Sequence, residues 1–131
     1  MSGFEIKIEN DNTEKTLKLK DEAVARALMI IGGKAEGYVK ALTPVDTGRL
    51  RNSITYKTKK QKSSPQSPAK GSDGVRGTPT EAQVFIGTNV EYAPYVEYGA
   101  QGRPARHMIK NGVGNHVDEY KNILKSELDG V

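Results

Sequence analysis

The triplet Asp46-Thr47-Gly48 has the residue types of an aspartic protease active site. That chemistry requires two triplets, one from each subunit of a dimer, so that two carboxylates share one proton. It also requires an apolar strand before the triplet and a small residue after it. Here residues 43–45 are Thr-Pro-Val, and bulky Arg49 follows. The structural alternative is that Asp46 or Thr47 caps a single helical turn and Gly48 makes the bend into a strand. The protease stays a remote alternative.

The remaining residues do not form a recognisable catalytic or metal-binding pattern. His107 and His116 are nine positions apart, which is not the spacing of a helical zinc pair, and the chain has no cysteine. The glycines at 32–33 and 112–114 lack the Lys-Ser/Thr pair of a phosphate loop. We therefore expect no enzyme activity, no metal, no cofactor and no small-molecule ligand.

A basic segment is the strongest electrostatic feature of the chain. The whole protein carries a net charge of +4, whereas residues 57–76 contain six cations and one carboxylate, Asp73, and so carry +5 by themselves. Lysines among Ser, Pro and Gln can neutralise nucleic-acid phosphates without reading bases, although a merely solvated loop is the commoner case. The candidate cations for such a contact are Lys57, Lys59, Lys60, Lys62, Lys70 and Arg76.

A second basic cluster precedes the last apolar repeat of the chain. Its members are Arg103, Arg106, His107 and Lys110. Cations at the start of a helix are unfavourable because the helix dipole is positive there. We expect compensation either from Glu91 or Glu97 in the preceding segment, or from an acidic partner or nucleic acid.

Apolar periodicity predicts the elements that position these groups. Residues 4–8 alternate as a strand, and residues 10–12 form a turn. Residues 1–19 form either a terminal strand or hairpin, or the lead-in to a helix. That helix is expected from an N-cap at Asp21 to residue 42, where Thr43-Pro44 ends it. The glycines at 32–33 predict a kink or a close neighbour.

The second half of the chain alternates strands, loops and helices. We expect a strand at 50–59, a mobile loop at about 60–80, a strand at 82–86, a short helix or turn at 91–99, and a helix at 105–128. The resulting fold class is α+β: one domain, 1–131, with a long N-terminal helix and a C-terminal helix on a small antiparallel sheet. Its long hairpin carries the flexible loop at its tip.

Length and composition exclude several other classes of protein. The 131 residues suffice for one domain with a core of its own. No apolar run approaches the roughly 18 residues of a membrane-spanning helix. The first residues lack the basic end and apolar stretch of a signal peptide. We therefore expect neither a membrane nor a secretory protein.

Two blocks of the sequence, and a third short stretch, resemble one known family. Residues 43–54 read TPVDTGRLRNSI and resemble the block aPvdTGrLrnSI of neck or tail-completion proteins of long-tailed bacteriophages; residues 90–99 read VEYAPYVEYG and resemble their block YAxyvEfG. Residues 103–106, RPAR, lie where the family has a proline-rich stretch before the last helix. The chain departs from the family at Ala100, where threonine is usual. The matching positions are Pro44, Asp46, Thr47, Gly48, Leu50, Ser53, Ile54, Tyr92, Ala93, Val96, Glu97, Gly99 and Pro104.

The resemblance implies a structural role in the virion. Such proteins form a ring between the head connector and the top of the tail, and DNA passes through the centre. The partners implied are further copies of the chain, with a hexamer as one option, head-completion or connector proteins, and tail-terminator or tail-tube proteins. Non-specific contact with packaged DNA is also implied, and the basic segment would face either the DNA channel or a neighbouring ring. Assembly would occur in the cytoplasm of the bacterial host.

A ring subunit needs surfaces for its neighbours on both sides. Tyrosine is enriched at such interfaces, although these tyrosines could also pack as core under the sheet. We expect both roles, with Tyr92 the most buried of the three. The candidate interface residues are Tyr92, Tyr95, Tyr98, Arg103, Arg106 and Lys110.

Overall fold

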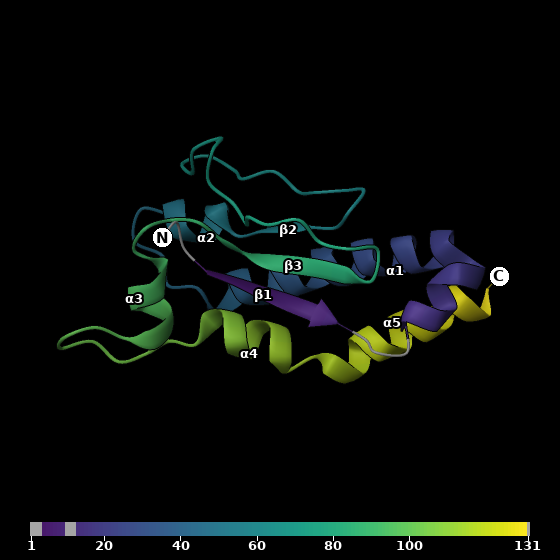
Figure 1. Cartoon of the computed structure of the whole chain (residues 1–131). Helices are drawn as coiled ribbons and strands as arrows, with labels where there is room; N and C mark the ends of the chain where they lie inside the picture. Colours follow the sequence, from purple (N-terminus) through teal and green to yellow (C-terminus); the bar gives the residue numbers. More distant parts are fainter. Residues whose placement is uncertain (1–3, 10–12, 131) are drawn as a thin grey trace.

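A three-stranded antiparallel sheet forms the centre of the molecule (Figure 1). The structure is a computed structural model that describes the backbone of residues 4–9 and 13–130 and the side chains from residue 22 to 130. Strand β3 (Gln83–Thr88) lies between β1 (Phe4–Glu9) and β2 (Thr55–Lys57). Register runs from Phe4↔Thr88 to Glu9↔Gln83 on one side and from Thr55↔Gly87 on the other. The strands expected at 4–8 and 82–86 and the antiparallel hairpin are confirmed; the turn expected at 10–12 lies outside the described residues.

Helix α1 (Thr13–Leu42) lies behind the sheet and runs from one end of the sheet to the other (Figure 1). It begins eight residues before Asp21. Both the N-cap at Asp21 and a terminal hairpin at 17–19 are therefore wrong. The residues before Asp21 are mostly Glu, Lys and Leu, which favour helix, and they extend it by two turns. Its end, just before Thr43-Pro44, is as predicted.

The two glycines of α1 have different surroundings. The helix continues through both of them. A Cβ atom placed on Gly32 would lie 2.6 Å from the Tyr56 ring and 2.9 Å from the Val84 side chain, whereas one on Gly33 would meet nothing within 4 Å. The sheet packs so closely on the helix backbone at position 32 that only glycine, which has no side chain, fits there without a clash.

The strand expected at 50–59 is wrong in its first half. Residues Arg49–Ser53 form a short helix, α2, and only β2 is a strand. Gly48, with a φ of 93°, turns the chain into this helix, and the Ser53 hydroxyl donates to the Leu50 carbonyl at 2.6 Å. These local bonds override the strand propensity of the segment.

The C-terminal segment folds as two helices rather than one. After α3 (Ala93–Tyr98), helix α4 (Met108–Gly114) begins three residues later than expected, and α5 (Val117–Asp129) follows a break. Gly114 and Asn115 have low helix propensity, which accounts for the break. Gly112 of α4 allows a close crossing, because a Cβ there would lie 2.7 Å from the Val39 Cα of α1.

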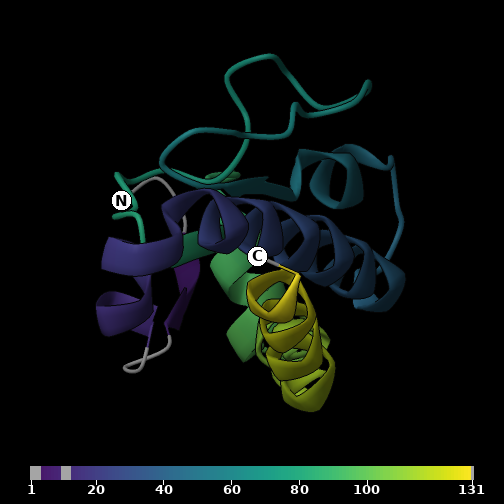
Figure 2. The same ribbon diagram turned by 90° about the vertical axis from the view of Figure 1, so that its right-hand side faces the viewer.

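Helices α4 and α5 both pack against α1, on the side opposite the 60–80 loop (Figures 1 and 2). The core lies where α1, β3 and α4 meet. Its larger buried members are Val24, Leu28, Ile31, Val39, Leu50, Ile54, Val84, Ile86, Val90, Met108, Ile109, Val113 and Tyr120. The α+β class, with N-terminal and C-terminal helices around a small antiparallel sheet, is confirmed.

Candidate functional site

Segments 44–50 and 92–106, more than forty residues apart in the chain, form the walls of one groove. The groove has a volume of about 950 Å³. It lies at the end of the molecule where α2 and α3 are found (Figure 1). The two sequence blocks therefore meet at one surface, and each wall can be traced to particular residues.

The first wall is the loop between α1 and α2. The Thr47 hydroxyl oxygen accepts the Arg49 backbone N–H at 3.2 Å, and Gly48 makes the bend. The bend expected at Gly48 is confirmed, except that it leads into a helix and not a strand. The cap expected at Asp46 or Thr47 is wrong, because the N-cap position of α2 is Gly48 and carries no side-chain capping bond. Asp46 is exposed in a loop that follows helix α1. The triplet is therefore preceded by a helix and a loop, and not by the apolar strand that an aspartic protease needs there.

Arg49 ties this wall to two other segments. Its Nε and Nη2 donate to the two Asp73 carboxylate oxygens, both at 3.1 Å, and its Nη1 donates to Glu91 Oε1 at 3.1 Å. Its guanidinium carbon lies 5.9 Å from the centre of the Tyr92 ring. The hydrogen bonds to Asp73 and then to Glu91 raise the pKa of Arg49, and the Arg49 guanidinium lowers the pKa of Asp73. The network fixes α2, the basic segment and the residue before Tyr92 relative to one another.

The second wall depends on a buried carboxylate. Glu97 of α3 is 2% exposed, and its two oxygens accept the backbone N–H groups of Ile109 at 2.8 Å and Lys110 at 3.1 Å. It therefore compensates the positive end of α4 from a neighbouring helix. Of the two acids proposed for this role, Glu97 fills it, whereas Glu91 pairs with Arg49.

Gly99 lets the chain reverse after α3. Its φ is 88°, and a Cβ there would lie 3.0 Å from the Ala105 backbone nitrogen. Residues 106 and 107 then bond back to α3: the Arg106 and His107 N–H groups donate to the Val96 and Glu97 carbonyls at 2.9 and 3.0 Å. This reversal brings the 100–106 segment to the edge of the groove.

The groove presents apolar and cationic groups to solvent. Three mostly apolar side chains of the groove are exposed to solvent: Val45 (56% exposed), Tyr92 (36%) and Tyr95 (64%). Arg103 and Arg106 are also exposed, and neither pairs with a carboxylate among the side chains described. Such a surface suits recognition of another macromolecule.

The sequence-predicted interface residues divide into two groups. Tyr92, Tyr95, Arg103 and Arg106 line the groove, whereas Tyr98 and Lys110 do not. Tyr92 is the least exposed of the three tyrosines, as expected.

The family-motif positions also divide between the groove and the interior. The motif residues that line the groove are Pro44, Asp46, Thr47, Gly48, Leu50, Tyr92, Val96 and Pro104. The buried ones behind it are Ser53, Ile54, Ala93 and Glu97. The sequence analysis did not identify Val45 and Arg49 as site residues. Val45 could have been found because it is an apolar residue in a loop, where apolar side chains are often exposed for binding.

The basic segment crosses the face above β2 (Figure 1). Apart from one isolated bridge between residues 57 and 62, it has no regular structure, and it is tied down by bonds such as Gln66 N–H to the Asn52 carbonyl at 2.9 Å. Lys59 pairs with Glu81 at 2.8 Å, and Lys57 donates to the Gly77 carbonyl at 2.7 Å. Its mobility stays a prediction.

The two histidines lie at the starts of different helices. His107 precedes α4, and His116 precedes α5 and stacks on Tyr38 with 3.6 Å between ring centres. Among the described side chains, those of residues 22–130, no cluster of three or more His, Asp or Glu is suited to hold a metal ion. Over residues 4–9 and 13–130, no helix has the length and apolar character needed to span a membrane.

Fold and site together define a small α+β protein with an exposed groove built from two separate sequence blocks. The family described as "Bacteriophage HK97-gp10, putative tail-component" matches residues 7–99, and the chain belongs to that family of phage tail components. The match includes α2, α3, the whole first wall of the groove and the part of the second wall up to residue 99. As a tail component the protein is part of the virion. No curated protein and no solved structure matches the chain.

Proposed function

We propose that this protein is a non-catalytic ring subunit of the joint between phage head and tail, acting as a neck or tail-completion protein. Membership of a tail-component family supports the virion role. Among its partners we propose further copies of the chain, the connector proteins of the head, and the tail-terminator or tail-tube proteins.

The groove is the observation that carries this proposal. Two blocks of the family meet there and leave Val45, Tyr92 and Tyr95 in solvent beside two arginines. A partner segment that combines apolar side chains with Asp or Glu would cover the apolar groups and pair with Arg103 and Arg106. The matching segment would come from the next ring subunit or from a connector protein.

Removal of the gene from its parent phage tests the proposal. Electron microscopy of the lysate should show filled heads and complete tails that are not joined, and supply of the gene from a plasmid should restore whole particles. Infectious particles of normal appearance without the gene would contradict a role in the joint.

Two other functions can be tested on the purified protein. A nucleic-acid-binding module that uses residues 57–76 is favoured by the unneutralised cations there, and should lose DNA affinity steeply with added salt. The remote alternative, a dimeric aspartic protease, predicts a peptidase activity that Asp46→Asn abolishes. A peptidase activity removed by that substitution would also contradict our proposal.

A further inference from the structure

We propose that the basic segment contains a pocket for a phosphate group, and that the backbone of nucleic acid is its source. The pocket has a volume of about 180 Å³ and lies between residues 62–65 and 71–76, above Thr55 of β2. Three of its lining side chains are cations: Lys57, Lys62 and Arg76. The inference stands on this pocket alone, whether or not the chain belongs to the head-to-tail joint.

Two of the cations are held in place without being neutralised. The Lys57 ammonium donates to the Gly77 carbonyl at 2.7 Å, and Arg76 Nη2 donates to the Ser72 carbonyl at 2.8 Å. A carbonyl oxygen orients a cation but leaves its net charge, and both groups retain further donors. Lys62 has no hydrogen-bond partner for its side chain among residues 22–130. The pocket therefore keeps three positive charges available for an anion.

The one carboxylate at the pocket is already engaged. Asp73 Oδ2 accepts the Arg49 Nε–H at 3.1 Å and the Lys70 backbone N–H at 2.8 Å, while Oδ1 accepts from Arg49 Nη2 at 3.1 Å. Its side chain is 6% exposed. Arg49, which also pairs with Glu91, thus engages Asp73 from outside the pocket, and Asp73 forms no ion pair with the cations that line the pocket.

Bonds to the body of the protein hold the pocket wall in position. The Gly74 N–H donates to Asn89 Oδ1 at 2.9 Å, and the Val75 N–H donates to the Thr55 hydroxyl oxygen at 2.8 Å. Gly74 has a φ of 134°, and a Cβ there would lie 2.9 Å from the Thr55 hydroxyl oxygen. A site whose frame is fixed before binding loses less entropy when the anion enters.

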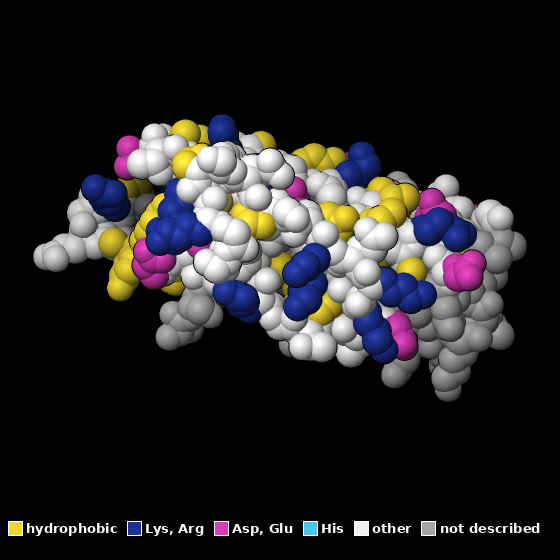
Figure 3. Space-filling model, turned by 90° about the horizontal axis from the view of Figure 1, so that it is seen from above, with side chains coloured by type: hydrophobic (Ala, Val, Ile, Leu, Met, Phe, Trp, Pro, Cys, Tyr) yellow, Lys and Arg dark blue, Asp and Glu magenta, His cyan; other side chains and the backbone are white. Residues whose placement is uncertain are grey.

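The surroundings favour a nucleic-acid phosphate over a free one. Lys60 and Lys70 lie on the same segment, outside the pocket, and form no ion pair among the side chains described. Figure 3 shows cations spread along this face of the molecule. A free phosphate would use the pocket alone, whereas a nucleic-acid strand presents further phosphates to these neighbours.

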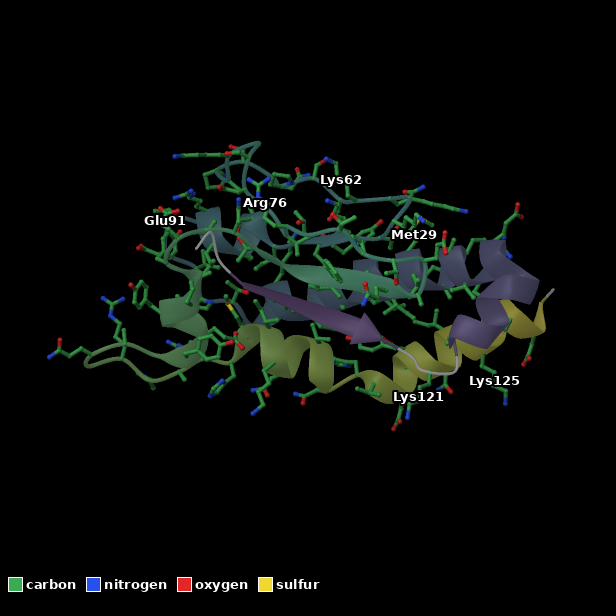
Figure 4. The ribbon with its side chains drawn as sticks, in the orientation of Figure 1. Met29, Lys62, Arg76, Glu91, Lys121 and Lys125 are labelled. Atoms are coloured by element: carbon green, nitrogen blue, oxygen red, sulfur yellow. The ribbon has the colours of Figure 1, made fainter. Side chains whose placement is uncertain are left out.

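The test compares two double variants that remove the same charge. Lys62→Gln with Arg76→Gln changes the pocket, and Lys121→Gln with Lys125→Gln changes exposed lysines of α5 on the opposite side of the molecule (Figure 4). Lys62→Gln alone guards against loosening of the loop, because the Lys62 side chain forms no hydrogen bond or ion pair with residues 22–130. Inorganic phosphate at constant ionic strength is titrated while the amide NMR signals of Gly71 and Gly74 are followed. Binding of a DNA duplex is measured by fluorescence anisotropy over a range of salt concentrations.

We expect phosphate to shift the Gly71 and Gly74 signals in the native protein and in the α5 variant, and not in the pocket variant. For DNA, the pocket variant should lower the magnitude of the slope of log K against log salt by about 0.9, the value for the one phosphate contact that the pocket makes, and the α5 variant should leave the slope unchanged. Phosphate shifts without a change in DNA binding would assign the pocket to free phosphate and overturn the nucleic-acid source. Absent phosphate shifts together with equal DNA affinities for the two double variants would overturn the pocket itself.

Discussion

Glu97 belongs to a sequence block of the family, yet its role is to stabilise the fold and not to contact a partner. Its buried carboxylate accepts two backbone N–H groups at the start of α4. Without it, the N–H groups of Ile109 and Lys110 would be left without an acceptor in a region shielded from water. The segment that carries Arg103 and Arg106 would then lose its anchor at the start of α4.

We predict that Glu97→Ala lowers the free energy of unfolding by about 1–3 kcal/mol, the usual effect of leaving buried donors unsatisfied. Glu97→Gln should lose less, because one side-chain oxygen remains as an acceptor. Urea denaturation followed by circular dichroism measures both. Glu22→Ala, at an exposed position of α1, is the control and should stay within about 0.5 kcal/mol of the native protein. A Glu97→Ala protein as stable as this control would contradict the capping role.

At the residue scale, the sequence predicted that the cations at the start of the last helix need a compensating acid, but not which acid supplies it. A run of cations at a helix start requires a nearby acid, and Glu91 and Glu97 were equally available along the chain. The choice depends on the reversal at Gly99, which turns α3 so that Glu97 faces α4. It also depends on Arg49, which binds Glu91 from another wall of the groove. Neither contact is local in sequence.

At the scale of elements, the packing of α1 on the sheet depends on one of two adjacent glycines. We predict that Gly32→Ala destabilises the protein by about 1–3 kcal/mol, because its methyl group would overlap Tyr56 and Val84. Gly33→Ala is the matched control. It adds the same methyl group to the same helix in open space and should stabilise by about 0.5–1 kcal/mol. Thermal denaturation of the two variants checks the opposite signs, and a shift in the same direction for both would contradict the close approach.

The link between α2 and the basic segment should give the protein a dependence on acid pH. The Arg49 hydrogen bonds hold the pKa of Asp73 below its ordinary value of 3.8. A carboxylate with a lowered pKa in the folded state contributes stability that is present above the unfolded-state pKa and is lost as the pH falls through the folded-state pKa. The contribution of this pair is therefore complete above about pH 4 to 5 and disappears below that range.

We predict that Asp73→Asn lowers the free energy of unfolding by about 2 kcal/mol at pH 7, a typical value for hydrogen bonds to a charged group. The difference from the native protein should shrink as the pH is lowered below about 4. Urea denaturation at a series of pH values measures it. Asp46→Asn, which removes an exposed carboxylate without an ion pair among the described side chains, should show no such trend. A constant difference at all pH values would contradict the role of the charge.

Elements with long apolar repeats were predictable, and those set by local bonds were not. The body of α1 and the strand at 82–86 follow from periodicity because packing and pattern agree there. The segment at 50–59 has strand-forming residues, yet Gly48 and the Ser53 hydroxyl make its first part helical. The helix expected at 105–128 kept its apolar face but broke at Asn115, where two weak helix formers are adjacent.

At the scale of the whole molecule, the groove is the feature that no single segment predicts. The residues of both walls could be named from the sequence, since both blocks resemble a known family. That they face each other depends on three separate features: the bend at Gly48, the Arg49 bridge to Glu91, and the reversal at Gly99. Val45 can be recognised as a groove residue only in this arrangement, because it is exposed to solvent beside Tyr92 and Tyr95.

The chain offers a matched pair of exposed valines that separates interface from fold. Val45, in the groove, is 56% exposed, and Val117, at the start of α5, is 45% exposed. Each valine changed to serine should leave the free energy of unfolding within about 0.5 kcal/mol, because neither side chain is part of the core. If the groove takes a partner segment, Val45→Ser removes an apolar contact of about 1–2 kcal/mol and weakens each contact roughly tenfold. A ring repeats that loss at every subunit, so phage that carry Val45→Ser should yield unjoined heads and tails by electron microscopy, whereas Val117→Ser phage should assemble normally. Equal yields of joined particles from the two variants would place the partner surface elsewhere on the molecule.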